Sequence, residues 1–158
     1  MYLAYLSSLT PTRGERERDM RVIYAPQSIP KEGHTVFLAG SIEMGIAENW
    51  QERFIKSHEK EDIIILNPRR TDWDNTWVQD ISNPKFREQV EWELNAMERA
   101  DEIFMYFDPT TKSPISLLEL GLFTRTGKMI VCCPKGFWRK GNVDVVCEKY
   151  GVIMVNDF

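Results

Sequence analysis

The sequence predicts an α/β fold, in which a five-stranded parallel, doubly wound sheet carries helices on both faces. Short apolar runs alternate along the chain with segments of helical character, and parallel strands need such helical crossovers. The chain has 158 residues, of which 42% are hydrophobic, and this suits one core. We therefore expect residues 21–158 to form a single domain. Residues 1–20 include dense mixed charge without apolar periodicity, so we expect a flexible extension there.

Five strands are expected where apolar runs of strand length stop at turn residues. The first run ends at Gly40-Ser41 and the second at Asn67-Pro68, and both pairs favour turns. None of the runs approaches the roughly 20 apolar residues that cross a bilayer, so we expect a soluble protein. In chain order, the expected strands are residues 35–39, 63–66, 103–107, 129–133 and 152–155.

Four helices are expected between these strands. The second has the clearest start, because Asn83 is a good N-cap and Pro84 suits the first helical position. The third starts in a similar way, at Ser113-Pro114. A long polar connection separates the second strand from the second helix. In chain order, the expected helices are residues 46–58, 84–100, 114–126 and 142–149.

The charge and the cysteines limit the partners and the compartment. The chain has 20 Lys and Arg against 24 Asp and Glu, a net charge of -4, so no global positive field attracts nucleic-acid polymers or anionic membranes. Two of the three cysteines are adjacent in an apolar run, which suits a reducing compartment, and we expect a cytoplasmic protein. His34 and His58 are isolated, so no metal site is expected.

Two glutamates stand out because they lie among apolar residues. At about 100° per residue, Glu93 falls inside the apolar stripe of the second helix, whereas Glu88 and Glu91 fall on the opposite side. Glu119 is the single charge in a third helix that is apolar on nearly every side. An unpaired carboxylate buried there is destabilising by several kcal/mol, roughly, or takes up a proton. Each is expected to reach into a functional site or to pair with a cation. The stripe consists of Phe86, Val90, Leu94, Met97 and Ala100.

The loops that follow the first and third strands are where a ligand is expected. In doubly wound sheets, ligands bind beyond the carboxyl ends of the strands, where the winding direction reverses. The loops concerned are residues 40–45 and 108–114. The backbone amides and the hydroxyl of Gly40-Ser41 suit a sugar or phosphate oxygen, although such a pair is also a common turn.

Three short motifs in the expected order resemble the nucleoside 2-deoxyribosyltransferase family and the related 2'-deoxynucleoside 5'-phosphate N-hydrolases. They are the segment Phe37-Leu38-Ala39-Gly40-Ser41-Ile42, Glu93 placed eight residues before Asp101, and Ser113 placed six residues before Glu119 in Glu119-Leu120-Gly121. The resemblance covers about residues 35–130. It implies a flavodoxin-like five-stranded sheet, in agreement with the element count.

The resemblance implies a role for several residues. Glu119 corresponds to the nucleophile, and Glu93 to an acidic residue beside the scissile bond that is often Asp in the family. Phe37 stands where the family often has Tyr, so a hydroxyl that positions the nucleophile is missing. Ser113 faces the 5' end of the sugar. Further substrate contacts are expected from Gly40, Ser41, Ile42 and Asp108.

The 5' group of the substrate is inferred from charge. In the nucleotide hydrolases an arginine that holds the phosphate follows the Gly-Ser-Ile turn, and here Glu43 occupies that place. A carboxylate close to a phosphate is unfavourable by several kcal/mol, roughly, in a partly dry site. We therefore expect a free nucleoside, with Ser41 and Ser113 able to serve either substrate.

Aromatic residues in loops are candidates for contacts with the base. Trp73 and Trp77, in the polar connection, and Trp138 offer large flat apolar faces, although ordinary packing explains each equally well. In relatives, the region equivalent to residues 136–142 closes a neighbouring subunit's pocket. The resemblance thus implies a homo-oligomer with shared active sites, to which Asn142 contributes.

The activity expected from these residues is transfer of a 2-deoxyribosyl group between nucleobases by a retaining double displacement, as part of nucleoside salvage. Glu119 forms a covalent deoxyribosyl intermediate, and Glu93 exchanges a proton with the base. The substrates are a 2'-deoxynucleoside and a free nucleobase, and no cofactor is expected. Two alternatives stay open. One is an N-glycosidase that hydrolyses a 2'-deoxynucleoside or its 5'-phosphate, and the other is a non-catalytic nucleotide-sensing module.

Overall fold

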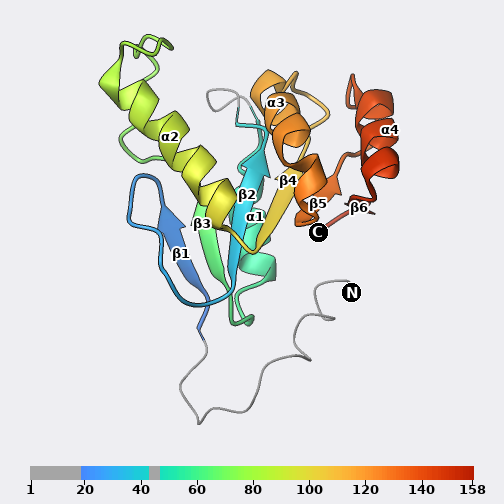
Figure 1. Cartoon of the computed structure of the whole chain (residues 1–158), viewed down its shortest axis with the longest axis horizontal. Coiled ribbons are helices and arrows are strands. Elements are labelled where there is room, and N and C mark those ends of the chain that lie inside the picture. The colour runs from blue at the N-terminus through green and yellow to red at the C-terminus, as the bar shows by residue number, and fades with distance from the viewer. Residues whose placement is uncertain (1–18, 43–46) are drawn as a thin grey trace.

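The computed structural model describes residues 19–42 and 47–158. Within them the chain forms one six-stranded, all-parallel sheet and four α-helices (Figure 1). The strands are β1 (Arg21–Tyr24), β2 (Thr35–Gly40), β3 (Ile64–Asn67), β4 (Glu102–Tyr106), β5 (Met129–Cys132) and β6 (Ile153–Val155). The helices are α1 (Trp50–Ser57), α2 (Pro84–Arg99), α3 (Pro114–Phe123), which continues into the 3-10 turn η3 (Thr124–Thr126), and α4 (Lys140–Tyr150).

The strand order is β1-β3-β2-β4-β5-β6. The five predicted strands are β2 to β6, and their order is that of the flavodoxin-like sheet, so the α/β fold is confirmed. The predicted number of strands is wrong by one, because β1 adds to the edge, with Arg21 opposite Ile64 and Tyr24 opposite Asn67. This four-residue edge strand is exposed at both ends, so it lacks the continuous apolar run that marked the other strands.

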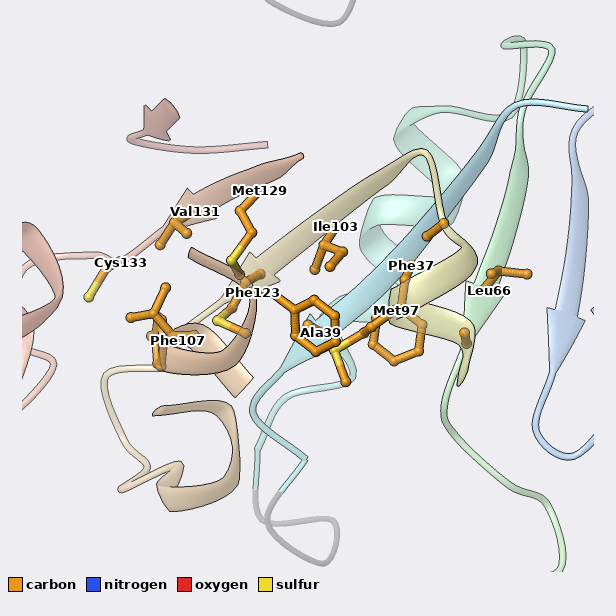
Figure 2. Packing of buried hydrophobic residues seen from close by; sticks show 14 of the residues in the cluster. Phe37, Ala39, Leu66, Met97, Ile103, Phe107, Phe123, Met129, Val131 and Cys133 are labelled. Atoms are coloured by element: carbon orange, nitrogen blue, oxygen red, sulfur yellow. The ribbon is translucent and has the colours of Figure 1, made fainter. Parts of the chain in front are cut away.

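Helices cover both faces of the sheet, as predicted. Residues of α2, α3 and α4 share one core cluster with the sheet, and residues of α1 share the other (Figure 1). Figure 2 shows part of the first cluster, in which Phe37, Ala39 and Met97 lie together. The winding direction reverses between β2 and β4. Their carboxyl ends, at Gly40 and Tyr106, therefore lie side by side at the predicted ligand position.

Both ends of α2 are fixed by side chains. The Asn83 side-chain oxygen accepts hydrogen bonds from the amides of Lys85 (3.0 Å) and Phe86 (3.3 Å), which confirms the predicted N-cap. Just beyond the last turn, the Asp101 carboxylate accepts from the Thr35 amide at 2.7 Å and from the Thr35 hydroxyl at 2.8 Å. The two hydrogen bonds between Asp101 and Thr35 connect the end of α2 to the start of β2.

The buried face of α2 differs from the predicted stripe. Gln89, Trp92, Ala96 and Met97 are buried, whereas Phe86, Val90 and Leu94 are only partly buried. The helix is rotated because the Trp92 ring packs towards the sheet, with its centroid 6.3 Å from that of Phe37. Glu93 lies between the buried side and the partly exposed apolar side.

The start of the first helix differs from the prediction. The predicted first helix began at residue 46, whereas α1 begins at Trp50. Of the predicted flexible extension at residues 1–20, residues 1–18 lie outside the described residues. Within the described part of the chain, no helix is long and apolar enough to span a bilayer.

On the α1 face, Phe158 closes the second core cluster. Its ring centroid lies 5.1 Å from those of Phe104 and Tyr106, and the Arg53 guanidinium lies 4.1 Å from it.

We expect Phe158→Ala to lower the free energy of unfolding by about 2 kcal/mol, because a half-buried aromatic ring is lost. Urea unfolding of the variant measures this. Phe158→Leu should lose less, and equal stability of Phe158→Ala and the parent would show that the ring does not hold this face.

Candidate active site

Glu93 and Glu119 come from neighbouring helices on one face of the sheet. Glu119 lies in the second turn of α3 and is 8% exposed, next to the buried Leu120. Glu93 lies in the middle of α2, with part of its side chain exposed but its carboxyl group buried. The negative charge of Glu93 acts on Glu119, so the two carboxyls lie close enough to influence each other.

Burial changes the protonation of both carboxyls. Burial raises the pKa of Glu119 to about 8, and the neighbouring charge of Glu93 raises it as well. Burial also raises the pKa of Glu93 to about 7, against the opposing effect of a hydrogen bond from Gln89. Among the described residues, neither carboxyl forms an ion pair with a lysine, arginine or histidine. A structural pairing with a cation therefore does not explain them within this part of the chain.

Three hydroxyl groups meet where β2, β4 and α3 come together. The Ser41 and Ser113 hydroxyls are hydrogen-bonded to each other. The Thr111 hydroxyl donates to the Ser41 hydroxyl oxygen at 3.0 Å, and lies 2.7 Å from that of Ser113. All three residues are buried. This hydroxyl cluster joins the carboxyl end of β2 to the start of α3.

The backbone at this edge has two unusual conformations. Gly40 has a φ of +135°, and a Cβ there would lie 2.1 Å from the Tyr106 carbonyl oxygen, so only glycine fits. Ser113 has a φ of 46° and precedes α3, as predicted, but its side chain makes no capping bond to the helix. Its hydroxyl points instead into the hydroxyl cluster.

Asp108 holds the β4–α3 loop in shape. One carboxylate oxygen accepts from the Thr110 amide (2.8 Å) and hydroxyl (2.7 Å), and the other from the Glu48 amide (3.3 Å). The Asp108 amide donates to the Ser41 hydroxyl oxygen at 2.9 Å. On the other side, the indole N–H of Trp50 donates to the Ser41 carbonyl oxygen at 2.9 Å. Ser41 is thus fixed from two directions.

Three further residues of the sequence prediction belong to β2 or to the loop that follows it. Phe37 is buried in the first core cluster beneath α2 and contacts Trp92. Ile42 follows Ser41 and is partly buried. Glu43, on which the choice of a free nucleoside depended, lies outside the described residues.

The predicted loop aromatics have other neighbours. Trp73 and Trp77 pack on each other with centroids 5.0 Å apart, and Arg70 lies 5.6 Å from the Trp77 ring. Arg70 in turn pairs with Glu88, on the exposed side of α2, and a contact of the two tryptophans with the base stays a prediction.

The segment before α4 lies over the β4–α3 loop. The Trp138 indole N–H donates to the Lys112 carbonyl oxygen at 2.9 Å, and the Lys112 amine and the Arg139 guanidinium lie 4.5 Å and 4.2 Å from its ring. Asn142 is exposed in the first turn of α4 and is not part of the hydroxyl cluster. Its contribution to a neighbouring subunit's site stays a prediction.

Sequence reasoning missed Thr111 and Gln89. Thr111 completes the hydroxyl cluster, and its place in the predicted ligand loop was the available signal. Gln89 precedes Glu93 by one helical turn, a spacing that puts two side chains on the same face. The sequence gives no sign of their contacts, which depend on how the loop folds and how α2 is rotated.

Comparison with known proteins adds the family. A family model described as nucleoside 2-deoxyribosyltransferase like matches residues 33–137, about two thirds of the chain. No curated protein matches the chain. The matched region runs from just before β2 to the segment before α4, and contains both carboxylates and the hydroxyl cluster.

Proposed function

The chain belongs to the nucleoside 2-deoxyribosyltransferase-like family, and from that premise we propose that it transfers a 2-deoxyribosyl group from a 2'-deoxynucleoside to a free nucleobase. The observation that supports this most is the pair of buried carboxyls, Glu119 on α3 and Glu93 on α2. A nucleophile and a proton donor of this kind are what a retaining displacement at C1' needs.

In the first displacement, a carboxylate oxygen of Glu119 bonds to C1' as the bond from C1' to the base breaks. The electron pair of that bond goes to the base nitrogen, which takes the proton of Glu93. In the second, a nitrogen of the incoming base bonds to C1', Glu119 leaves as a carboxylate, and Glu93 recovers a proton from the new base. Two inversions retain the configuration at C1'.

The proposed chemistry needs exactly one proton on the two carboxyls, and this predicts the pH profile. The pair loses its protons with pKa values of about 7 and about 8. Below about pH 7 both carboxyls are protonated and no nucleophile is available, and above about pH 8 both are ionised and no proton is left for the base. Between these values the pair holds one proton, and the reactive form is the one in which Glu93 carries it. We expect kcat/KM to peak between these values and to fall about tenfold per pH unit on either side. A profile that is flat from pH 6 to pH 9 would exclude the pair as the acid and nucleophile.

The hydroxyl cluster of Ser41, Thr111 and Ser113 supports a sugar-binding role for the adjacent edge. We propose that the 5'-hydroxyl of a free deoxynucleoside binds there, with Gly40, Ile42 and Asp108 shaping the loops and Phe37 forming the floor. Ribonucleosides should react more slowly, because a 2'-hydroxyl makes positive charge at C1' harder to develop.

A transfer assay tests the function. The protein is incubated with deoxyadenosine and a different free base, and the products are separated by chromatography. A new deoxynucleoside supports the proposal. Free base and deoxyribose alone support the N-glycosidase, and saturable binding without bond cleavage supports the sensing module. Repeating the assay with 5'-phosphates tests the preference for a free nucleoside.

An exposed apolar face supports a homo-oligomer. On α3, Ile115, Leu118 and Leu122 are 61%, 60% and 56% exposed, on the helix that carries Glu119. Contiguous apolar surface of this kind marks interaction sites. We propose that a second copy covers it and that Asn142 reaches a neighbouring site.

Leu118→Glu should dissociate this oligomer, because it places a charge in the proposed interface. Sedimentation velocity measures the mass of the variant and the parent. Val78→Glu, which changes a 67% exposed residue of the connection between β3 and α2, is the control and should keep the mass of the parent. A monomeric parent would contradict the proposal.

A further inference from the structure

Gln89 makes two hydrogen bonds through one nitrogen. It lies one turn before Glu93 on α2 and is 5% exposed. Its side-chain nitrogen donates to one carboxyl oxygen of Glu93, Oε1, at 2.7 Å, and to the Pro68 carbonyl oxygen at 2.8 Å. Pro68 precedes the long connection between β3 and α2, so Gln89 links Glu93 to the end of a strand.

The orientation of this amide is fixed by Pro68. A backbone carbonyl oxygen can only accept a hydrogen bond, so the NH₂ group must face it and the amide cannot be flipped. The side-chain oxygen of Gln89 is consequently buried with no hydrogen-bond partner among the described residues. Leaving an acceptor unpaired is unfavourable, and an apolar side chain of this size would avoid it. The two N–H bonds are therefore the feature that favours glutamine here.

The bond to Oε1 also decides where Glu93 holds a proton. In a protonated carboxyl group, the oxygen that accepts an N–H bond is the carbonyl oxygen, and the proton is on the other oxygen. We propose that Gln89 is a positioning residue that fixes the Glu93 carboxyl and keeps its exchangeable proton on Oε2, the oxygen available to the base. The inference rests on the proposed function for the role of that proton.

Within the described part of the chain, the other groups around Glu93 offer no second way to fix its carboxyl. Across from α2, the titratable group that acts on the pair is Glu119 of α3, which repels an ionised Glu93. From the β3–α2 connection, Pro68 contributes a carbonyl that is already bonded to Gln89. Among the described residues, the side-chain N–H of Gln89 is thus the group that donates a hydrogen bond to the Glu93 carboxyl.

The test compares Gln89→Met with Gln51→Met in the full chain. Gln51 is a matched control, since it is also buried, also has an unpaired amide atom, and lies on α1 at the opposite face. The titration of Glu93 is followed by ¹³C NMR of carboxyl-labelled glutamate, assigned with Glu93→Gln. We expect Gln89→Met to raise the pKa of Glu93 by about one unit, because the ionised form loses a donor, and Gln51→Met to leave it unchanged.

The pH dependence of kcat gives a second readout. Gln89→Met should lower kcat by about tenfold with little change in KM, and should move the alkaline limb of the profile to higher pH. If Gln89→Met does not fold, Gln89→Asn is measured instead, because its amide is one methylene too short to reach both partners. An unchanged Glu93 titration in the folded variant overturns the inference. The NMR result does not depend on turnover, so it still decides the role of Gln89 if the parent has no transferase activity.

Discussion

Glu119→Gln is expected to reduce deoxyribosyl transfer by about 10⁴-fold or more while making the protein more stable. The rate falls because an amide cannot form the bond to C1' that the carboxylate of Glu119 forms. Shape and size are retained, so binding of the nucleoside should change little. A loss in kcat without a comparable rise in KM is the expected kinetic result.

The gain in stability follows from the raised pKa. Burial raises the pKa of Glu119 from its ordinary value of 4.5 to about 8 in the folded chain, so folding favours the protonated form. Its contribution to stability is fully present below about pH 4.5 and is lost as the pH rises through about 8. Glutamine carries no such charge, so Glu119→Gln should gain up to about 4–5 kcal/mol at pH 8.5 and little at pH 4.5.

Thermal unfolding at these two pH values and single-turnover kinetics measure both effects. Glu148→Gln, at an exposed position of α4, is the control and should match the parent in both. A Glu119→Gln variant with more than a tenth of the parent's rate would remove Glu119 from the mechanism. Equal stability at pH 8.5 would show that its carboxyl is not ionised in an apolar environment.

Gly40→Ala is expected to destabilise the fold strongly. An added Cβ would lie 2.1 Å from the carbonyl oxygen of Tyr106 and 2.9 Å from its amide nitrogen, and both are backbone atoms that cannot move away. The φ of +135° is also unfavourable for alanine. We expect a loss of about 4 kcal/mol or failure to fold at 37 °C.

The matched control for this substitution is Gly121→Ala on α3. No atom lies within 4 Å of the Cβ that it adds, and alanine favours helix by up to about 1 kcal/mol over glycine. Chemical denaturation of the two variants should therefore give opposite signs. If Gly40→Ala unfolds at the same denaturant concentration as the parent, β2 and β4 do not approach each other as closely at this edge as the structure indicates.

The strands that are buried on both faces were predictable because they form continuous apolar runs. β1 was missed because a short edge strand that is exposed at its ends needs no such run. The orientation of α2 was predicted less well, because Phe86, Val90 and Leu94 are apolar without being fully buried. Periodicity identifies an apolar side of a helix, but it does not tell whether the sheet or another protein covers it.

Some residues of the candidate site could likewise be predicted from the sequence, and others could not. Glu93 and Glu119 were predictable one at a time, since a charge among apolar residues stands out in the sequence. The hydroxyl of Thr111 and the amide of Gln89 were not, because polar residues in a loop or on a helix are common and their bonds exist only in the folded chain. The connection of residues 67–83 has no periodicity, so the neighbours of its tryptophans could not be predicted either.

Trapping the covalent intermediate tests the central claim that Glu119 bonds to the sugar. A 2'-deoxy-2'-fluoronucleoside slows both displacements, because fluorine at C2' disfavours positive charge at C1', and the adduct then accumulates when no acceptor base is present. Mass spectrometry of the digested protein should find the fluorinated sugar on the peptide that contains Glu119, and should find none in Glu119→Gln. Release of the base with no adduct, or an adduct on another residue, would contradict the account.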